Sequence, residues 1–499
     1  MNRKTMIKLR AFTITILALS AHCTAQIANI DAGNVKQTID GFGASTAWHG
    51  QLSDQEADAA FKNETGNQMG LSILRIRIDE NGNYSDELIN ARKAMARGAV
   101  IFAAPWDAPA VMVERVGDIK RIRYDMYDEY ARYLDYFVSY MSRHSAPLYC
   151  ISVQNEPDWN GGWNQWTSGE MLTFMRDYAH LITGTKIMAP ESFQFRHEMS
   201  DPILNDPIAC ENLDIVGGHI YGAGLASYPL AEEKGKKIWM TEHYINEDDI
   251  TTCINQFAKE IIDCMYNNMN AFVWWYLRQP DCNLINTGGS LRRKGYTMAH
   301  FSKFIRPGYH RIDATYRPQS GVYMVAFKGK EIVVVVINSS TSRKEQTFTY
   351  RGVSIPRVKR YTTTGSGNLS DEGIIVLTDN TFSAALHAMS ITTFVGTDTS
   401  AGGKPQRHIL GQNYPNPFNL ITNISVSVTE STEISLKIYD VLGQEVATLV
   451  NDILPTGTYT VTWDARDSGG SRAASGIYFY RLDAGNGNHV STKKMLLIK

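Results

Sequence analysis

The sequence predicts a (β/α)8 TIM barrel with an attached β-sandwich side domain, followed by a small C-terminal all-β sandwich. Three patterns in the 499-residue chain support this fold class. Over residues 39–308, eight apolar runs alternate with amphipathic helical stretches, as in a parallel barrel. Residues 309–396 and 412–499 instead carry short runs of alternating apolar and polar residues without helical periodicity, which is typical of β-sandwiches. The polar segment 397–411 separates them and has the composition of a linker.

The first 25 residues have the pattern of a signal peptide. Four basic residues begin it: Arg3, Lys4, Lys8 and Arg10. An apolar run over 11–21 and small residues ending at Ala25 follow. This run is shorter than the ~20 residues that span a bilayer, and no later stretch reaches that length, so we expect no membrane span. A lipoprotein leader anchored through Cys23 is the weaker alternative, because His22 precedes the cysteine where a small residue is expected.

The formal net charge is −2, and losing the four basic residues of the leader would change it to −6. Since no basic stripe is present, nucleic acid is not an expected partner. After the leader, five cysteines remain, without regular spacing or a CxxC pair, so no structural zinc site, metal or other cofactor is expected. Cys150 lies in an apolar strand pattern and should be a buried thiol. Cys253 and Cys264 share one predicted helix about 16 Å apart along its axis, which is too far for a disulfide.

Each apolar run of the barrel region is expected to be one strand. The eight expected strands are Gly41–Ala44, Ser72–Ile78, Ala99–Trp106, Leu148–Val153, Lys186–Pro190, Asp214–Ile220, Lys237–Thr241 and Ala271–Leu277. The clearest helical stretches between them are Tyr127–Ser142, Ser168–Thr183 and Thr252–Asn267. A doubly wound open sheet has the same alternation and is the alternative architecture.

The side domain should contain strands from both ends of the catalytic region. Six alternating runs are expected as strands: Val322–Phe327, Glu331–Ile337, Gln346–Tyr350, Val358–Thr362, Gly373–Leu377 and Ser390–Phe394. The strand-like segment over 26–38, at the mature N-terminus, is expected to join them.

Two glutamates follow the fourth and seventh expected strands, and barrel active sites lie at the C-terminal ends of the strands. Glu156 is the third residue of the run Gln-Asn-Glu-Pro, and Glu242 precedes His243. A retaining glycosidase needs two carboxyl groups about 5–5.5 Å apart, one to protonate the leaving oxygen and one to attack the anomeric carbon. We therefore interpret Glu156 as the acid/base and Glu242 as the nucleophile. Solvated loop acids are the alternative reading.

Several polar and aromatic residues near strand ends are candidates for substrate binding. Asn155 precedes the acid and can donate to a sugar hydroxyl, and Arg75 can hold Glu242 ionised, although a structural ion pair would explain Arg75 equally. The remaining candidates are Trp48, Trp106, Trp159, His219, Tyr221, Tyr244, Trp275 and Arg278. Core packing is the alternative role for some of the tryptophans and for His219.

The catalytic region resembles glycoside hydrolase family 30, most closely its glucuronoxylanase subfamily. The resemblance covers about residues 26–396 and rests on ordered segments: Ile39–Ala44, Ser72–Ile76, Phe102–Trp106, Ile151–Pro157, Ala189–Ser192, Trp239–Glu242, Val273–Tyr276, Ala299–Phe304 and Arg306–Tyr309. It implies a barrel whose side domain is built from both chain ends, and endo-cleavage of β-1,4-xylan with retention. By position, Glu156 matches the family's acid/base and Glu242 its nucleophile.

One segment departs from the subfamily pattern. These enzymes recognise a glucuronic acid branch with an arginine after strand eight, within two consecutive arginines, and with Tyr/Ser groups after strand seven. Here strand eight is followed by Arg278-Gln279-Pro280-Asp281, and the loop after strand seven, 243–249, is acidic. Because a carboxylate is best bound by an arginine without nearby acids, we expect reduced dependence on the branch. Arg292 or Arg293 remains a candidate substitute.

The C-terminal module resembles the sorting domain of the type IX secretion system. The residues that carry this resemblance are Asn413–Asn419, Tyr439–Gln444, Gly476–Phe479 and Lys493–Lys499. It implies a secreted or cell-surface protein that engages the secretion machinery. A carbohydrate-binding module is the alternative, but it would need an exposed aromatic platform, and Trp463 is the module's one tryptophan.

The expected function is a retaining endo-β-1,4-xylanase that acts on (glucurono)xylan as a monomer. Two alternatives remain open. One is another retaining β-glycosidase of the same family, acting on a β-1,6-glucan or a β-glucoside. The other is a non-catalytic polysaccharide-binding protein, which the retained Asn155, Glu156 and Glu242 disfavour.

Overall fold

The computed structural model describes residues 27–222, 224–279, 282–399, 409–428, 431–455, 457–485 and 489–498. The expected signal peptide with Cys23, most of the expected linker, and Pro280 with Asp281 lie outside the described residues. The chain divides into two compact units, which we describe separately. One contains the chain up to residue 352 together with 357–397, and the other contains 353–356 together with 398–499.

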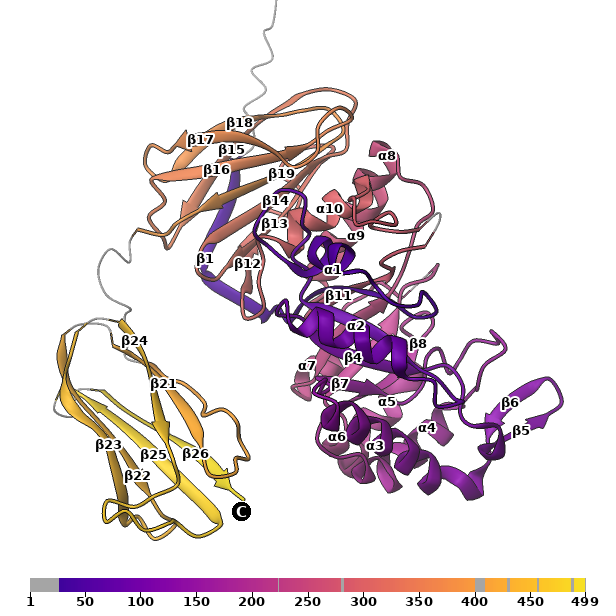
Figure 1. Cartoon of the computed structure of the whole chain (residues 1–499). Helices are drawn as coiled ribbons and strands as arrows, with labels where there is room; N and C mark the ends of the chain where they lie inside the picture. Colours follow the sequence, from indigo (N-terminus) through magenta and orange to yellow (C-terminus); the bar gives the residue numbers. More distant parts are fainter. Residues whose placement is uncertain are drawn as a thin grey trace, which may run out of the picture. The chain divides into compact units, whose positions relative to one another are not determined.

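Eight parallel strands of the first unit form a closed barrel in the order β10-β11-β2-β3-β4-β7-β8-β9 (Figure 1). These strands are β2 (Gly41–Ser45), β3 (Ile73–Ile78), β4 (Val100–Pro105), β7 (Cys150–Ser152), β8 (Lys186–Ser192), β9 (Ile215–His219), β10 (Lys237–Glu242) and β11 (Ala271–Tyr276). They coincide with the eight expected runs apart from small differences at their ends. Because the sheet closes on itself, the doubly wound alternative is excluded and the expected barrel is confirmed.

The helices around the barrel are α1 (Asp54–Phe61), α2 (Ser85–Met95), α3 (Tyr127–Arg143), α4 (Ser168–Asp177), α5 (His197–Asn205), α6 (Pro207–Asn212), α7 (Pro229–Glu233), α8 (Ile250–Thr252), α9 (Lys259–Tyr266) and α10 (Arg293–Ser302). The longest, α3, buries an apolar stripe against the barrel. The helix expected over Thr252–Asn267 is divided, because a π-helical segment, Cys253–Ala258, joins α8 to α9. A two-stranded hairpin, β5 (Val113–Val116) and β6 (Ile119–Ile122), follows β4.

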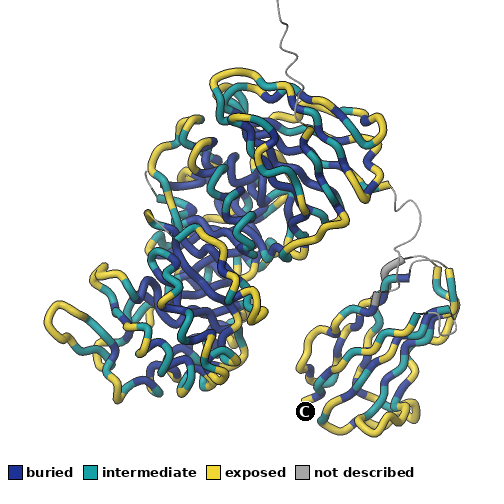
Figure 2. The backbone as a smooth tube through the Cα atoms, turned by 180° about the vertical axis from the view of Figure 1, so that it is seen from behind, coloured by how far each residue is buried: buried dark blue, intermediate teal, exposed yellow. Residues whose placement is uncertain are grey.

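Large side chains and one close backbone contact determine how the barrel is packed. Phe102, Met188 and Trp239 belong to one buried hydrophobic cluster, and all three are completely buried. Figure 2 shows this buried interior in dark blue, with the exposed residues concentrated in the loops. Cys150 belongs to the same cluster and is a buried free thiol, as expected. At Gly43, a Cβ atom would lie 2.6 Å from the carbonyl oxygen of Ile73, so the pairing of β2 with β3 requires glycine there.

The side domain is a nine-stranded sheet in the order β17-β16-β19-β14-β13-β12-β1-β15-β18. Its strands are β1 (Ile27–Thr38), β12 (His310–Ala314), β13 (Val322–Lys328), β14 (Ile332–Asn338), β15 (Lys344–Arg351), β16 (Arg357–Thr363), β17 (Ser370–Val376), β18 (Thr381–Leu386) and β19 (Ser390–Gly396). The N-terminal strand β1 lies between β12 and β15. Phe348 of β15 and Phe382 of β18 pack on Phe394 of β19, with ring centroids 5.2 and 5.0 Å apart. Strands distant in the sheet order therefore face each other across a core, as in a sandwich.

The barrel and the side sheet pack together through helix α10. The ring nitrogens of its buried His300 lie 2.8 Å from Thr393 Oγ1 and 2.9 Å from Thr363 Oγ1. Burial lowers the pKa of His300 to about 3, so this residue is a neutral packing group.

The second unit is an all-β structure of two sheets. One contains β20 (Ile409–Leu410), β21 (Thr422–Val428) and β24 (Gly457–Trp463), and the other contains β22 (Thr432–Tyr439), β23 (Glu445–Leu454), β25 (Gly476–Ala484) and β26 (His489–Leu497). Trp463 is 1% exposed and packs on Phe418 and Tyr478. Its ring therefore belongs to the core and offers no platform for a sugar. Among the described residues of the whole chain, no helix is long and apolar enough to cross a membrane.

Candidate active site

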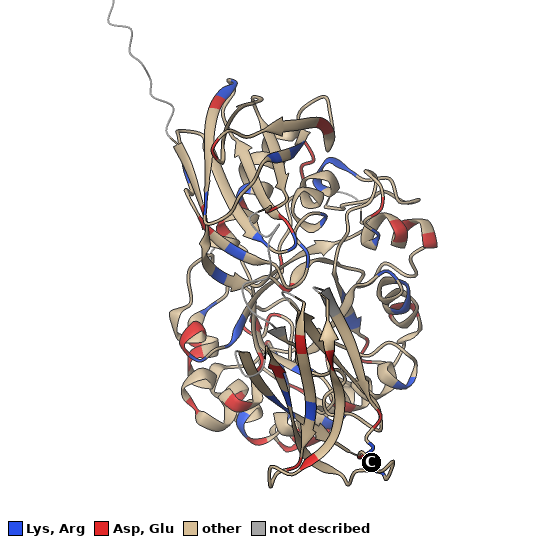
Figure 3. Ribbon diagram, turned by 90° about the vertical axis from the view of Figure 1, so that its left-hand side faces the viewer, with Lys and Arg blue, Asp and Glu red and all other residues tan. Residues whose placement is uncertain are grey.

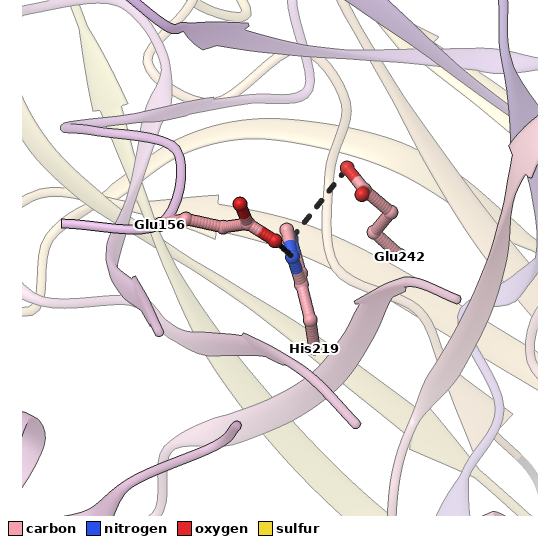
Figure 4. A group of neighbouring side chains, drawn as sticks. All are labelled: Glu156, His219 and Glu242. Carbon is pink, nitrogen blue, oxygen red and sulfur yellow. Dashed lines mark hydrogen bonds and ion pairs between the residues drawn. The ribbon is translucent and has the colours of Figure 1, made fainter. Parts of the chain in front are cut away.

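Glu156 and Glu242 meet at the C-terminal end of the barrel. Glu156 lies four residues after the end of β7 and has a positive φ of 43°, and Glu242 is the last residue of β10. Their exposed fractions are 4% and 5%. One carboxylate oxygen of each lies within 4.8 Å of the other, and both lie within that distance of a ring nitrogen of His219 (Figure 4). The strand ends expected to carry the acids therefore bring them together.

His219, the last residue of β9, lies between the two glutamates and is completely buried. Its Nδ1 lies 2.8 Å from Glu156 Oε1, and its Nε2 lies 3.4 Å from Glu191 Oε1 and 3.9 Å from Glu242 Oε2. Burial favours the neutral ring, but Glu242 and the other two carboxylates outweigh it and raise the pKa of His219 to about 9. At neutral pH, His219 is therefore an imidazolium that donates to Glu156.

Burial raises the pKa of Glu156, although the hydrogen bond from His219 acts in the opposite direction. Because Oε1 of Glu156 already accepts from His219, a proton on this carboxyl group belongs on Oε2. The Glu156 main chain is held as well, since its N–H donates to the Glu191 carbonyl oxygen at 3.0 Å and its carbonyl oxygen accepts from Trp163 Nε1 at 3.2 Å.

Arg75 of β3 is completely buried and connects Glu242 to Glu191. Its guanidinium donates to Glu242 Oε2, to Glu191 Oε1 at 2.8 Å and to Asn155 Oδ1 at 2.7 Å. Burial opposes the charge, but Glu191 and Glu242 more than compensate and raise the pKa of Arg75. The guanidinium also lies 4.7 Å from the ring centre of Trp106. Arg75 thus fixes the orientation of the Glu242 carboxylate.

Glu191 completes this network, and the sequence reasoning assigned it no role. It is the next-to-last residue of β8, has a positive φ of 59° and is fully buried. Burial alone would raise the pKa of Glu191, but Arg75 and His219 hold it below its usual value. An acid at the end of a fifth barrel strand was visible in the sequence. Its link to Arg75 and His219 required the three-dimensional arrangement.

Asn155 presents an unpaired hydrogen-bond donor in the site. Its Oδ1 accepts from Arg75, while its Nδ2 is buried and has no hydrogen-bond partner among the described residues. A buried donor without a partner is costly, at about 1–3 kcal/mol, unless a ligand or water satisfies it. A bound sugar hydroxyl would satisfy it, in agreement with the role expected for this amide.

Known proteins resemble this chain over most of its length. Glucuronoxylanase XynC of Bacillus subtilis (strain 168) is 42% identical over 407 residues, which cover 77% of this chain and 96% of that protein. The structure of a GH30 endoxylanase from Clostridium papyrosolvens C71 is 43% identical, with a TM-score of 0.70, covering 74% of this chain and all of that one. A family 30 subfamily 8 xylanase from Clostridium acetobutylicum gives 42% identity and a TM-score of 0.71, again over 74% of this chain and all of that one.

The chain belongs to glycoside hydrolase family 30. It is therefore a glycosidase. This disfavours the alternative that the barrel belongs to a non-catalytic polysaccharide-binding protein. Residues 412–499 of this family 30 enzyme match the family described as a secretion system C-terminal sorting domain, so the protein is secreted or displayed at the cell surface. The resemblance of the catalytic region to family 30 and that of the C-terminal module to the sorting domain are both confirmed.

Two aromatic clusters flank the glutamates of the family 30 enzyme. Trp48, Trp106 and Trp275 form one, with ring centroids 4.6 to 6.1 Å apart. Trp48 is 52% exposed, and the Arg77 guanidinium lies 5.0 Å from its ring centre, whereas Trp106 is buried. Each of the three comes from the end of a different barrel strand. The cluster therefore brings together three expected tryptophans that are far apart in the sequence: Trp48, Trp106 and Trp275.

The second cluster is an aromatic row on the other side of the site. Trp159 is 44% exposed and stacks on Phe193 with centroids 4.3 Å apart, and Phe193 stacks on Tyr221 at 5.3 Å. Tyr221 donates to Glu242 Oε1 at 2.8 Å, and Tyr244 packs edge-on against its ring at 5.8 Å. Burial and Glu242 raise the pKa of Tyr221, which keeps the phenol protonated as a donor. Phe193, which links Trp159 to Tyr221, was not among the expected site residues.

Arg278, which is expected to bind substrate, forms hydrogen bonds within the protein, and its role in substrate binding stays a prediction. Its Nη1 donates to both carboxylate oxygens of Glu56, at 2.7 and 2.8 Å, and its Nη2 donates to the His49 carbonyl oxygen at 2.6 Å. Glu56 also forms the capping box of α1 with Ser53. The two amino groups of Arg278 are therefore engaged within the protein.

The other two arginines proposed to substitute are also engaged. Arg292 pairs with Asp248, from the acidic loop after β10, at 3.1 Å. Arg293 donates to the carbonyl oxygen of Thr364, in the side domain, at 2.8 Å. No described arginine near the end of β11 is thus left without an internal partner.

Glu156, His219 and Glu242 have the donor types of a metal site, but their environment disfavours a cation. Arg75 already contacts Glu242 directly, and the pKa of His219, at about 9, keeps its ring protonated at neutral pH. A protonated imidazole has no lone pair for a metal ion. The arrangement instead has His219 donating to Glu156 and Arg75 donating to Glu242.

Proposed function

We propose that the chain is a retaining endo-β-1,4-xylanase that acts on (glucurono)xylan, with Glu156 as acid/base and Glu242 as nucleophile. The separation of the two carboxylates, with oxygens within 4.8 Å, supports retention, because inverting enzymes hold the two groups about 6.5–9.5 Å apart to admit a water. The relatives named as glucuronoxylanase and xylanase support xylan as the substrate.

The first step forms a glycosyl-enzyme ester. Glu242 attacks the anomeric carbon, while Glu156 gives its Oε2 proton to the glycosidic oxygen and the bond to the leaving sugar breaks. Arg75 and Tyr221 each hold one Glu242 oxygen, which fixes the attacking group before the substrate arrives. The free amide of Asn155 is available to a sugar hydroxyl, a contact that strengthens in the transition state.

The second step releases the sugar with its original configuration. Glu156, now ionised, takes a proton from a water molecule, whose oxygen attacks the anomeric carbon and breaks the ester to Glu242. His219 donates to Glu156 Oε1 throughout, so Oε2 both gives and takes the proton. In this mechanism, His219 positions the acid/base.

The decisive experiment follows the anomeric configuration by NMR during hydrolysis of xylan. The β-anomer should accumulate first, and initial appearance of the α-anomer would refute retention. Glu242→Gln should abolish turnover but preserve binding of xylo-oligosaccharides. Glu156→Ala should regain turnover of an activated aryl glycoside when azide is added, giving a β-glycosyl azide. Unchanged turnover in either variant would refute its assigned role.

We also propose that cleavage depends less on glucuronic acid branches than in enzymes with a free arginine after strand eight. The pairing of Arg278 with Glu56 and of Arg292 with Asp248 supports this proposal, because a uronate would have to compete with an internal carboxylate for each guanidinium. The test is product analysis on glucuronoxylan and on unbranched xylo-oligosaccharides. Cleavage confined to linkages at a fixed distance from uronate branches would overturn it.

A further inference from the structure

A cationic groove lies between the barrel and the side domain, within the first compact unit. Its volume is about 580 Å³, and it is lined from the barrel side by Asn63, Lys303, Phe304, Arg306 and Tyr309 and from the side domain by Lys330, Glu331, Arg357, Lys359, Tyr361, Ile374, Val395 and Thr397. This size is in the range of small-molecule sites, about 300–1,000 Å³.

The groove is at the opposite end of the barrel from the glutamates. Lys303 and Arg306 follow the C-terminal end of α10, where Ser302 Oγ donates to the Met69 carbonyl oxygen at 2.7 Å. Met69 and Gly70, which accepts from Arg306, immediately precede the start of β3, whereas Glu156 and Glu242 lie at strand C-termini. A ligand in this groove therefore cannot occupy the active site.

Positive charge in the groove is largely uncompensated. Five of its lining residues are lysine or arginine and one is acidic. Lys303 donates to Asn63 Oδ1 and to the Thr65 carbonyl oxygen, both at 2.8 Å, and so has no carboxylate partner. Burial and the nearby Arg306 lower the pKa of Lys303 to about 8, which shows how poorly its charge is compensated. A bound anionic group would compensate the positive charge of Lys303.

Exposed cations at the groove rim complement the half-buried Lys303 and Arg306. Lys330 and Arg357 are both exposed, and no ion pair joins either to another described residue. Lys359 is paired with Asp371 at 2.8 Å. Along the ribbon seen in Figure 3, basic residues in blue and acidic residues in red are interspersed. A local excess of cations on a chain with net charge −2 therefore points to an anionic ligand.

Aromatic rings accompany these charges. Phe304 and Tyr361 pack with centroids 4.7 Å apart. The ring of Tyr309 covers Gly329, where an added Cβ atom would meet it at 2.2 Å. Rings beside arginine and lysine suit a ligand that has both apolar faces and carboxylates, which is the chemistry of a uronic acid sugar.

We infer that this groove is a second polysaccharide-binding site, which holds a uronate-bearing segment of the xylan chain away from the active site. The inference rests on the proposed function for the identity of the polymer. It also gives the acidic branches a binding partner in a protein whose arginines near the end of β11 are engaged internally. The groove then anchors the enzyme on substituted xylan while the glutamates cleave another stretch of chain.

The test measures binding of the full chain carrying Glu242→Gln, so that the polymer is not consumed. Lys330→Ala with Arg357→Ala removes two exposed groove cations, and Lys36→Ala with Arg351→Ala is the matched control, with the same charge change at two exposed side-domain residues outside the groove. The ligands are glucuronoxylan and the same polymer after carboxyl reduction. At low ionic strength, the groove variant should bind glucuronoxylan roughly three- to tenfold more weakly, and the control variant should be unaffected.

Three outcomes would overturn the inference. They are equal glucuronoxylan affinity of the groove and control variants, an equal loss of affinity for the carboxyl-reduced polymer, and displacement by inorganic phosphate at lower concentration than by glucuronate. With Glu242 intact, the groove variant should keep the wild-type kcat/KM on short unbranched xylo-oligosaccharides. Absence of xylan cleavage in the wild-type chain would refute the proposed function, whereas normal cleavage with unchanged binding would refute the groove alone.

Discussion

The charge of His219 depends on the balance between burial and the three carboxylates around it. The pKa of His219 in the folded protein, about 9, lies above the ordinary value of 6.5. The folded protein therefore binds this proton more tightly than the unfolded chain does. The resulting stabilisation is fully present below about pH 6.5 and is lost as the pH rises through about 9. Glu156, whose pKa is also raised, contributes in the same direction over a lower pH range.

We therefore expect the free energy of unfolding to fall between pH 6 and pH 10 by up to roughly 3 kcal/mol more in the wild type than in His219→Gln. Urea unfolding at several pH values measures this difference. The glutamine keeps a donor toward Glu156 but cannot ionise. If both proteins lose the same stability over this range, His219 does not carry the charge assigned to it.

Arg278 is expected to matter for stability rather than for recognition of the uronate branch. Arg278→Ala leaves the carboxylate of Glu56, whose side chain is 2% exposed, without its guanidinium partner, which should cost about 2 kcal/mol and lower Tm. The ratio of kcat/KM for branched and unbranched xylo-oligosaccharides should not change. Arg278→Lys, which keeps the charge but not the two-pronged pairing, is the control. A selective loss on the branched substrate would show that Arg278 reaches the uronate.

At the level of elements, the sequence pattern predicted all eight strands of the barrel but only part of the strands of the side sheet. The eight barrel strands are buried apolar runs, and such runs are recognisable without tertiary information. The strands β12, His310–Ala314, and β18, Thr381–Leu386, were not expected. They contain charged or small residues in place of a clear alternation, and their pairing with β13 and β15 determines their conformation.

The site shows the same division between local and distant information. Glu156, Glu242 and Asn155 belong to recognisable segments at strand ends, and Arg75 belongs to a recognisable strand, so their shared location could be predicted. The pairing of Arg278 with Glu56, which is 222 residues away in sequence, could not. No local pattern connects a helix-capping acid with an arginine after the eighth strand.

The contact between β2 and β3 offers a test at the level of elements. In Gly43→Ala, the new methyl group would meet the carbonyl oxygen of Ile73 at 2.6 Å and its Cβ at 2.8 Å, so the two strands would have to separate. We expect a loss of roughly 1–3 kcal/mol in the free energy of unfolding. Gly66→Ala is the control, because a Cβ there meets nothing within 4 Å. Equal stability of the two variants in urea unfolding would contradict this account.

At the level of the whole molecule, the two compact units should be separable in function. A chain ending at residue 397 keeps the barrel, the side sheet and the groove, and the family 30 relative from Bacillus subtilis aligns with only 77% of this chain. We expect this truncated enzyme to keep the kcat/KM of the full chain on xylo-oligosaccharides. In its native host it should fail to reach the medium or the cell surface, because residues 412–499 are the sorting domain. Fractionation and assay of both forms test the two halves of this prediction.

The position of β1 has a consequence for the order in which the protein folds. Ile27 pairs with Thr347, 320 residues later, so the first strand of the sheet has no neighbour on that side until most of the chain has been synthesised. Contacts of such high sequence separation form slowly, and an unpaired strand edge favours aggregation while it waits. The side sheet therefore closes late, after the barrel segments between its two halves have emerged. A chain that is incomplete before residue 347 therefore has an open edge beside β1, which proteases and other chains can attack.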